Sequence, residues 1–209
     1  MKYILLHGLG QTSSSWGNTV KAINNEFDIY CPDLSDWLCN AEPCYSNLYR
    51  GLEKYCEQFN EPLNLCGLSL GGTLALQYGI EHRDKINSLV LMGTQFSMPK
   101  KLLKLQNMIF RLMPNSTFDK MGFDKMDVIN LSKSMMDLDF RSHLKSINCR
   151  VLVICGERDK ANKSASLELK ERIPNAEFSV IANAGHEVNL DNPAGLGSAL
   201  NIFFQAVKS

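Results

Sequence analysis

The segment Cys66-Gly67-Leu68-Ser69-Leu70-Gly71-Gly72 predicts the fold of this chain. An apolar run over residues 62–66 precedes it, and a stretch of helical character over residues 73–80 follows it. The segment is therefore expected to turn sharply from a strand into a helix, with Ser69 at the turn. So tight a turn brings neighbouring backbone close, and the positions two before and two after the serine must lack bulky side chains.

Ser69 has two possible roles. A serine at this place could simply cap the following helix, but the flanking glycines would then be an entropic cost without a purpose. A strained turn that presents a nucleophilic hydroxyl requires those glycines. The pattern therefore favours Ser69 as a nucleophile.

Apolar strands and amphipathic helices alternate on both sides of this turn. The strands are continuous apolar runs, which suits a sheet covered on both faces. Such alternation predicts an α/β fold, a three-layer α/β/α arrangement around a six-stranded and mostly parallel sheet built by right-handed crossovers. The expected strands span residues 3–6, 27–31, 62–66, 86–92, 151–155 and 177–181.

The alternation stops between residues 95 and 147. No strand is evident there, and Pro99 can open a helix. We expect residues 1–94 and 148–209 to form the core, with residues 95–147 inserted as a short helical lid. Seven of the nine methionines lie in this insertion, where they either pack the lid or line an adaptable apolar pocket, two compatible interpretations; they are Met98, Met108, Met113, Met121, Met126, Met135 and Met136.

A serine hydroxyl needs a base, and the base needs an acid to orient it. In this architecture the order along the chain is serine, acid, histidine. His186 follows the strand expected at 177–181, and two carboxylates, Glu157 and Asp159, follow the strand expected at 151–155. Either carboxylate could orient the imidazole.

Over essentially its whole length the chain resembles an α/β-hydrolase-fold serine hydrolase of the esterase type. The resemblance implies Ser69 as nucleophile, His186 as base and Asp159, rather than Glu157, as the orienting acid. It also places the oxyanion hole at the backbone N–H groups of Leu9 and Leu70, as does the expected convergence of their two loops. The segments that carry the resemblance are His7-Gly8-Leu9-Gly10, residues 67–72, residues 156–159, and Gly185-His186 with residues 190–193.

One feature departs from the family pattern. Family members usually carry an antiparallel strand pair ahead of the His-Gly strand, whereas only six residues precede His7. Without that pair, the strand over residues 27–31 would be an exposed edge, open to pairing with a second chain. We therefore expect a monomer or a homodimer.

The resemblance implies hydrolysis of a small carboxylic ester or related acyl compound, without metal or organic cofactor. The same triad also serves hydrolases and lyases of carbon–carbon or carbon–nitrogen bonds and cofactor-free perhydrolases. A ligand-binding module with a vestigial triad is a further alternative. A serine at the turn disfavours the dehalogenase and epoxide hydrolase branches, which carry an aspartate there.

Composition excludes several other classes. The chain has 209 residues, 44% of them apolar, with 22 Lys and Arg against 22 Asp and Glu, so nothing favours nucleic acid or a membrane as a partner. No apolar run is long enough to span a membrane, and the early polar His7 disfavours a signal peptide. Seven scattered cysteines suggest reduced thiols. We expect a cytoplasmic protein.

Overall fold

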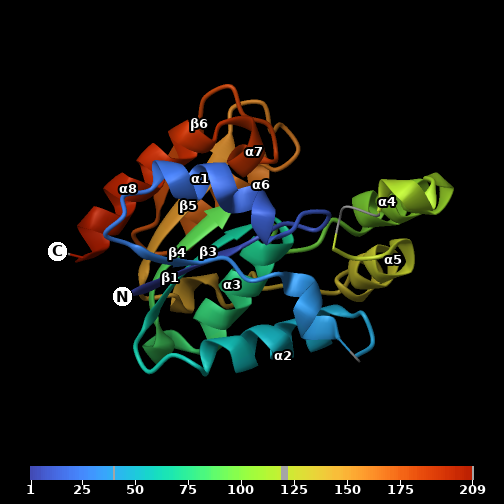
Figure 1. Cartoon of the computed structure of the whole chain (residues 1–209), viewed down its shortest axis with the longest axis horizontal. Coiled ribbons are helices and arrows are strands. Elements are labelled where there is room, and N and C mark those ends of the chain that lie inside the picture. The colour runs from blue at the N-terminus through green and yellow to red at the C-terminus, as the bar shows by residue number, and fades with distance from the viewer. Residues whose placement is uncertain (40, 119–121, 209) are drawn as a thin grey trace.

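The structure is a computed structural model that describes residues 1–39, 41–118 and 122–208 (Figure 1). Met121, one of the methionines noted above, lies outside the described residues. No helix in these ranges is long and apolar enough to cross a membrane.

A six-stranded sheet forms the centre of the described chain, in the order β2-β1-β3-β4-β5-β6. All five strand pairings are parallel, so the sheet is more regular than the mostly parallel one expected. The α/β class is confirmed. The strands are β1 (Lys2–Leu6), β2 (Asp28–Tyr30), β3 (Leu63–Leu68), β4 (Ile86–Met92), β5 (Arg150–Gly156) and β6 (Glu177–Ile181).

Helices cover both faces of this sheet (Figure 1). The α-helices are α1 (Gly17–Ala22), α2 (Tyr45–Cys56), α3 (Leu70–Glu81), α4 (Lys100–Leu112), α5 (Lys125–Ser134), α6 (Lys163–Arg172), α7 (Val188–Asp191) and α8 (Pro193–Lys208). Short 3-10 helices are η1 (Ser13–Trp16), η2 (Leu34–Leu38), η3 (Arg83–Lys85), η4 (Asn115–Thr117) and η5 (Leu144–Ser146).

Alternating side chains of the central strands divide the core into two apolar layers. In β4, Leu89 and Leu91 belong to the layer packed by α2, α3 and α6, whereas Val90 and Met92 belong to the layer packed by α8. This alternation follows from the two-residue period of a strand. The sheet is therefore buried on both faces, which explains why its strands are continuous apolar runs.

Strand β2 lies at an edge of the sheet, as expected, and is only three residues long. The first residue of β2, Asp28, forms an ion pair with Lys2 of β1. Short length and charge are both features that limit pairing of an edge with another chain. Homodimerisation through this edge stays a prediction.

The insertion, residues 95–147, contains α4, η4, α5 and η5. Its two ends are held together where Phe140 N–H donates to Phe96 O at 2.7 Å and Met98 N–H donates to Leu138 O at 3.1 Å. Lys125 Nζ, at the start of α5, donates to the carbonyl oxygen of Met113 at 2.6 Å, which ties α5 to the end of α4. The sequence indicated a helix after Pro99 but gave no signal for α5.

Candidate active site

Ser69 lies between β3 and α3 in a backbone conformation that residues other than glycine seldom adopt. Its φ is 53° and its ψ is −110°. The Ser69 N–H donates to Met92 O at 2.8 Å, so the end of β4 holds the turn in place. Strand β3 runs two residues further than the sequence indicated, and α3 begins directly after Ser69. The connection is therefore a single strained residue.

The glycines around Ser69 are required by contacts with backbone. A Cβ on Gly67 would lie 2.2 Å from Gly71 O, and one on Gly71 would lie 2.2 Å from Leu6 O. At Gly72 the nearest atom belongs to a side chain: its Cβ would lie 2.0 Å from Thr94 Oγ1, with the backbone Gly67 O at 2.9 Å. The steric argument made from the sequence agrees with these distances, and it extends to a third glycine.

His186 and Asp159 are paired beyond the carboxyl ends of β6 and β5. His186 Nδ1 lies 2.9 Å from Asp159 Oδ2. Because an ionised carboxylate only accepts hydrogen bonds, Nδ1 carries a proton, and the tautomer that this bond selects has Nε2 as its acceptor. Asp159 is buried, whereas the His186 side chain is 39% exposed. The ring thus keeps one nitrogen on the carboxylate and the other available.

Asn162 completes this pair and was not identified from the sequence. Its Nδ2 lies 2.9 Å from each carboxylate oxygen of Asp159, and its backbone N–H donates to Oδ1 at 3.2 Å. Burial alone would raise the pKa of the Asp159 carboxyl, but the hydrogen bonds from His186 and Asn162 outweigh burial and lower it. The carboxylate therefore stays ionised. An amide three residues after an acid, at the start of a helix, was the available signal.

Glu157, the other carboxylate of this loop, points elsewhere. Its Oε2 accepts the Asn183 N–H at 2.8 Å, and the residue is exposed. Glu157 therefore fixes the loop that carries His186 without contacting the imidazole. Geometry separates two carboxylates that are equivalent in a reading of the sequence alone.

Gly93, directly after β4, gives the imidazole its space. Its φ is +53°, and a Cβ there would lie 2.8 Å from both Cε1 and Nδ1 of His186. The preceding residue, Met92, is the one whose carbonyl accepts the Ser69 N–H. The end of β4 is thus in contact with the nucleophile turn and with the imidazole. Gly93 was noted from the sequence only as the end of a strand.

The first loop is built around His7, which is buried. His7 Nε2 accepts the Leu34 N–H at 3.0 Å, and Nδ1 lies 2.9 Å from Gly8 O, so the ring is neutral with its proton on Nδ1. Burial lowers the pKa of His7, in agreement with this. The ring thereby fixes the loop that carries Leu9, as expected for a histidine that shapes this loop.

A cavity of about 250 Å³ is lined by four of the five predicted site residues, Leu9, Ser69, Leu70 and His186, whereas Asp159 is not part of its lining. No hydrogen bond among the described residues links Ser69 Oγ to His186, so the structure places both side chains on one cavity without joining them. Leu70 is the first residue of α3, so its backbone N–H has no partner within the helix. The lining residues are Leu9, Ser69, Leu70, Thr73, Gln95, Met98, Pro99, Leu103, Gln106, Ser132, Met135, Ala161, Asn162 and His186.

The methionines of the insertion divide between these surroundings. Met98 and Met135 line the cavity, whereas Met108 and Met126 are more than half exposed. Leu112 of α4 is 83% exposed. The two interpretations made from the sequence, packing of the lid and lining of a pocket, therefore apply to only part of the insertion. Met108, Met126 and Leu112 are instead largely exposed.

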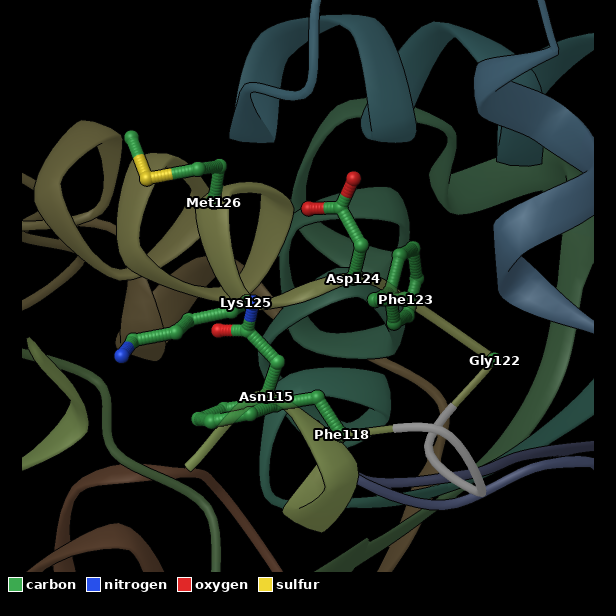
Figure 2. A pocket seen from close by; sticks show the side chains of 7 residues that line it. All are labelled: Asn115, Phe118, Gly122, Phe123, Asp124, Lys125 and Met126. Atoms are coloured by element: carbon green, nitrogen blue, oxygen red, sulfur yellow. The ribbon is translucent and has the colours of Figure 1, made fainter. Parts of the chain in front are cut away.

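A larger hollow of about 680 Å³ lies within the insertion, between η4 and the start of α5 (Figure 2). In Figure 2 the carboxylate of Asp124 and the amino group of Lys125 point in different directions. Asp124 accepts the Asp127 N–H at 2.8 Å and so caps α5. Of the described residues lining this hollow, none forms a nucleophile and base pair. The chemistry is therefore assigned to the smaller cavity.

The chain belongs to the α/β-hydrolase-fold family, whose model matches residues 4–125, more than half of its length. The solved structure of a thermophilic esterase from Thermogutta terrifontis superposes with a TM-score of 0.83 at 20% identity, covering 100% of this chain and 91% of that one. At this identity the likeness shows the shared fold. The protein is accordingly an enzyme of the α/β-hydrolase class.

Two curated relatives differ in chemistry. A 2-hydroxy-6-oxononadienedioate/2-hydroxy-6-oxononatrienedioate hydrolase from Paraburkholderia phymatum is 24% identical over 88% of this chain and 80% of that protein. A pimeloyl-[acyl-carrier protein] methyl ester esterase from Vibrio cholerae is 29% identical over 44% of this chain. The matched part of this chain spans 36% of the length of that esterase. It spans 22% of another relative, an abhydrolase domain-containing protein from Caenorhabditis elegans.

Proposed function

We propose that the protein is a serine hydrolase that cleaves small carboxylic esters. The observation that carries the proposal is that His186, hydrogen-bonded to Asp159, lines the same cavity as Ser69, whose backbone is strained. Strain at a single non-glycine residue in a cavity wall is typical of a functional position. The match to an esterase supports the ester as substrate.

In the proposed reaction, His186 Nε2 removes the proton from Ser69 Oγ as the oxygen attacks the ester carbonyl carbon. The carbonyl oxygen becomes negatively charged and accepts hydrogen bonds from the backbone N–H groups of Leu9 and Leu70. Collapse of this intermediate expels the alcohol, which takes the proton from His186. Water, deprotonated by the same nitrogen, then releases the acid and restores Ser69.

Asp159 supports this cycle without leaving its ionised state. A lowered pKa keeps the carboxylate negative, so it stabilises the imidazolium formed at each proton transfer. Asn162 holds both carboxylate oxygens at 2.9 Å and so fixes the direction from which His186 is supported. Asn162 is in this proposal a positioning residue.

The insertion acts as a lid over the acyl site in this proposal. Met98, Leu103 and Met135 bring apolar side chains to the cavity from the insertion, where they can exclude water from the bound ester. A cavity of about 250 Å³ accommodates a small substrate.

A fluorophosphonate probe tests the nucleophile directly, because it reacts only with a serine activated by a working base and oxyanion hole. We expect covalent labelling at Ser69 in the wild type and none in Ser69→Ala, together with loss of p-nitrophenyl ester turnover to below about a tenth of the wild-type rate. Melting temperatures of both proteins control for folding. A folded Ser69→Ala variant that keeps its turnover would show that Ser69 is not the nucleophile.

Carbon–carbon bond hydrolysis is the second candidate, favoured by the long match to the Paraburkholderia hydrolase. The same triad would serve it. A 2-hydroxy-6-oxo-dienoate substrate separates the two candidates: Ser69-dependent cleavage of this compound, with no turnover of esters, would replace the ester proposal.

A further inference from the structure

The polar groups in the wall of the cavity differ in whether they already have partners. On the core side, the side chains of Thr73, Gln95 and Asn162 already have partners. Thr73 Oγ1 donates to Ser69 O at 3.1 Å, and Gln95 Nε2 donates to Asn162 Oδ1 at 2.8 Å. The amide of Asn162 in turn donates to both carboxylate oxygens of Asp159. These groups hold the triad in position.

On the opposite side, Ser132 of α5 has a hydroxyl without any partner among the described residues. Only 2% of Ser132 is exposed, so water does not replace the missing hydrogen bond readily. A buried hydroxyl in that state destabilises the fold, and of the six described residues with such a side-chain atom, Ser132 alone lines the cavity. Ser132 lines the cavity, so rotation of its side chain about χ1 would turn the sealed hydroxyl toward a bound molecule, which can supply the partner.

Gln106 of α4 stands in the same wall. It is half-buried, lines the cavity and has no hydrogen bond among the described residues. Helices α4 and α5 pack on each other, so both residues come from the same part of the insertion. Among the polar side chains that the insertion contributes to the cavity wall, Ser132 and Gln106 are the two with no hydrogen bond among the described residues, and their neighbours there, such as Met98, Leu103 and Met135, are apolar.

The charge of the cavity limits what could bind there. Its described lining contains no Lys, Arg, Asp or Glu, and His186 is the sole ionisable side chain apart from the hydroxyls. A carboxylate or an ammonium group would lose its hydration without meeting an opposite charge. A hydroxyl and a primary amide can together donate to a carbonyl oxygen, or exchange hydrogen bonds with a hydroxyl.

We propose that Ser132 and Gln106 form a polar subsite that binds a second, neutral oxygen function of the substrate, a keto, hydroxyl or amide group remote from the scissile ester. This inference rests on the proposed function and narrows its substrate class to esters that carry such a group in either the acyl or the alcohol part. A substrate lacking the group leaves the buried hydroxyl unpaired, and sites of this kind reject such analogues strongly.

Pairs of esters that differ only in that group test the proposal. Suitable acyl pairs are p-nitrophenyl 4-oxopentanoate with 4-methylpentanoate, and 5-oxohexanoate with 5-methylhexanoate. An alcohol pair is 3-oxobutyl acetate with 3-methylbutyl acetate, followed by proton release. In the wild type we expect kcat/KM for the oxo member to exceed that for the methyl member at least tenfold in one pair.

The variant Ser132→Ala should reduce that ratio about tenfold, and Gln106→Met should reduce it in the same pair. Ser166→Ala is the matched control, because Ser166 is a fully buried helical serine outside the cavity lining, and it should leave the ratio unchanged. The melting temperature of Ser132→Ala should rise, since alanine removes an unpaired buried hydroxyl and favours the helix.

The outcomes separate this inference from the ester proposal. Ester turnover that depends on Ser69, with the same oxo-to-methyl ratio in the wild type and in Ser132→Ala for every pair, would overturn the subsite alone. A lower melting temperature of Ser132→Ala would also overturn it, because the hydroxyl would then have a structural partner. Failure of the wild type to cleave any of these esters would overturn both.

Discussion

At the scale of single residues, this protein keeps an unfavourable backbone conformation at the position proposed for chemistry. Ser69 has φ 53° and ψ −110°, a conformation that glycine adopts readily and a residue with a Cβ adopts only at a cost in free energy. Conformations of this kind cost on the order of 1–3 kcal/mol and persist where surrounding structure holds them. Here the Ser69 N–H bond to Met92 O and the packed glycines supply that constraint.

This strain predicts opposite effects of one change on stability and on activity. Ser69→Gly should melt above Ser69→Ala by a few degrees, because both lack the hydroxyl but only glycine relaxes at this φ; about 1 kcal/mol corresponds to roughly 2–4 °C for a chain of this size. Both variants should be inactive. Differential scanning calorimetry of the two side by side measures the difference, and equal melting temperatures would show that the turn stores no strain.

The two loop carboxylates give a second prediction at this scale. Asp159→Asn should lower kcat on the order of a thousandfold or more, because Asn no longer fixes the imidazole tautomer or stabilises the imidazolium. Glu157→Gln should cost less than about tenfold, since that side chain accepts only the Asn183 N–H. Steady-state kinetics of both variants on one ester makes the comparison; equal impairment would remove Asp159 from its proposed role.

At the scale of elements, the β3–α3 connection depends on close approach of two backbone segments. Gly67→Ala should destabilise the protein by at least about 3 kcal/mol, because the new Cβ would lie 2.2 Å from Gly71 O and backbone cannot rotate away. Gly17→Ala is the control. No atom lies within 4 Å of a Cβ there, and Gly17 is helical, so alanine should stabilise by up to about 1 kcal/mol. Urea unfolding measures both, and a mild effect of Gly67→Ala would contradict this account of the turn.

At the scale of the whole molecule, the core and the insertion together enclose a cavity of about 250 Å³, small for a drug-sized ligand. We therefore expect kcat/KM to be highest for short to medium acyl chains in a p-nitrophenyl series from acetate to palmitate, measured below micelle formation. Activity that keeps rising to the longest chain would mean that the insertion moves aside.

Much of the fold follows from local patterns along the chain. Strands β4 and β6 have the bounds that their apolar runs indicate, and the glycine spacing correctly places a strand before Ser69 and a helix after it. Helix α5 was not predicted because it is short and its apolar residues recur only weakly at helical spacing. Its position depends instead on packing against α4 and the core. The spacing of apolar residues along a sequence predicts helices and strands, but it does not predict which separate elements contact one another.

The sequence by itself determined the α/β class and the Gly67-x-Ser69-x-Gly71 turn, because strand and helix periodicity and glycine sterics act within a few residues. The family resemblance favoured Asp159 over Glu157, and the tertiary structure gives the contact itself, His186 with Asp159. Only the tertiary structure decided that Asn162 holds that carboxylate and that Gly93 makes room for the ring. The same holds for the unpartnered hydroxyl of Ser132, a residue far from Ser69 in the sequence. Such features depend on which distant segments are packed together, and packing is fixed by the whole chain at once.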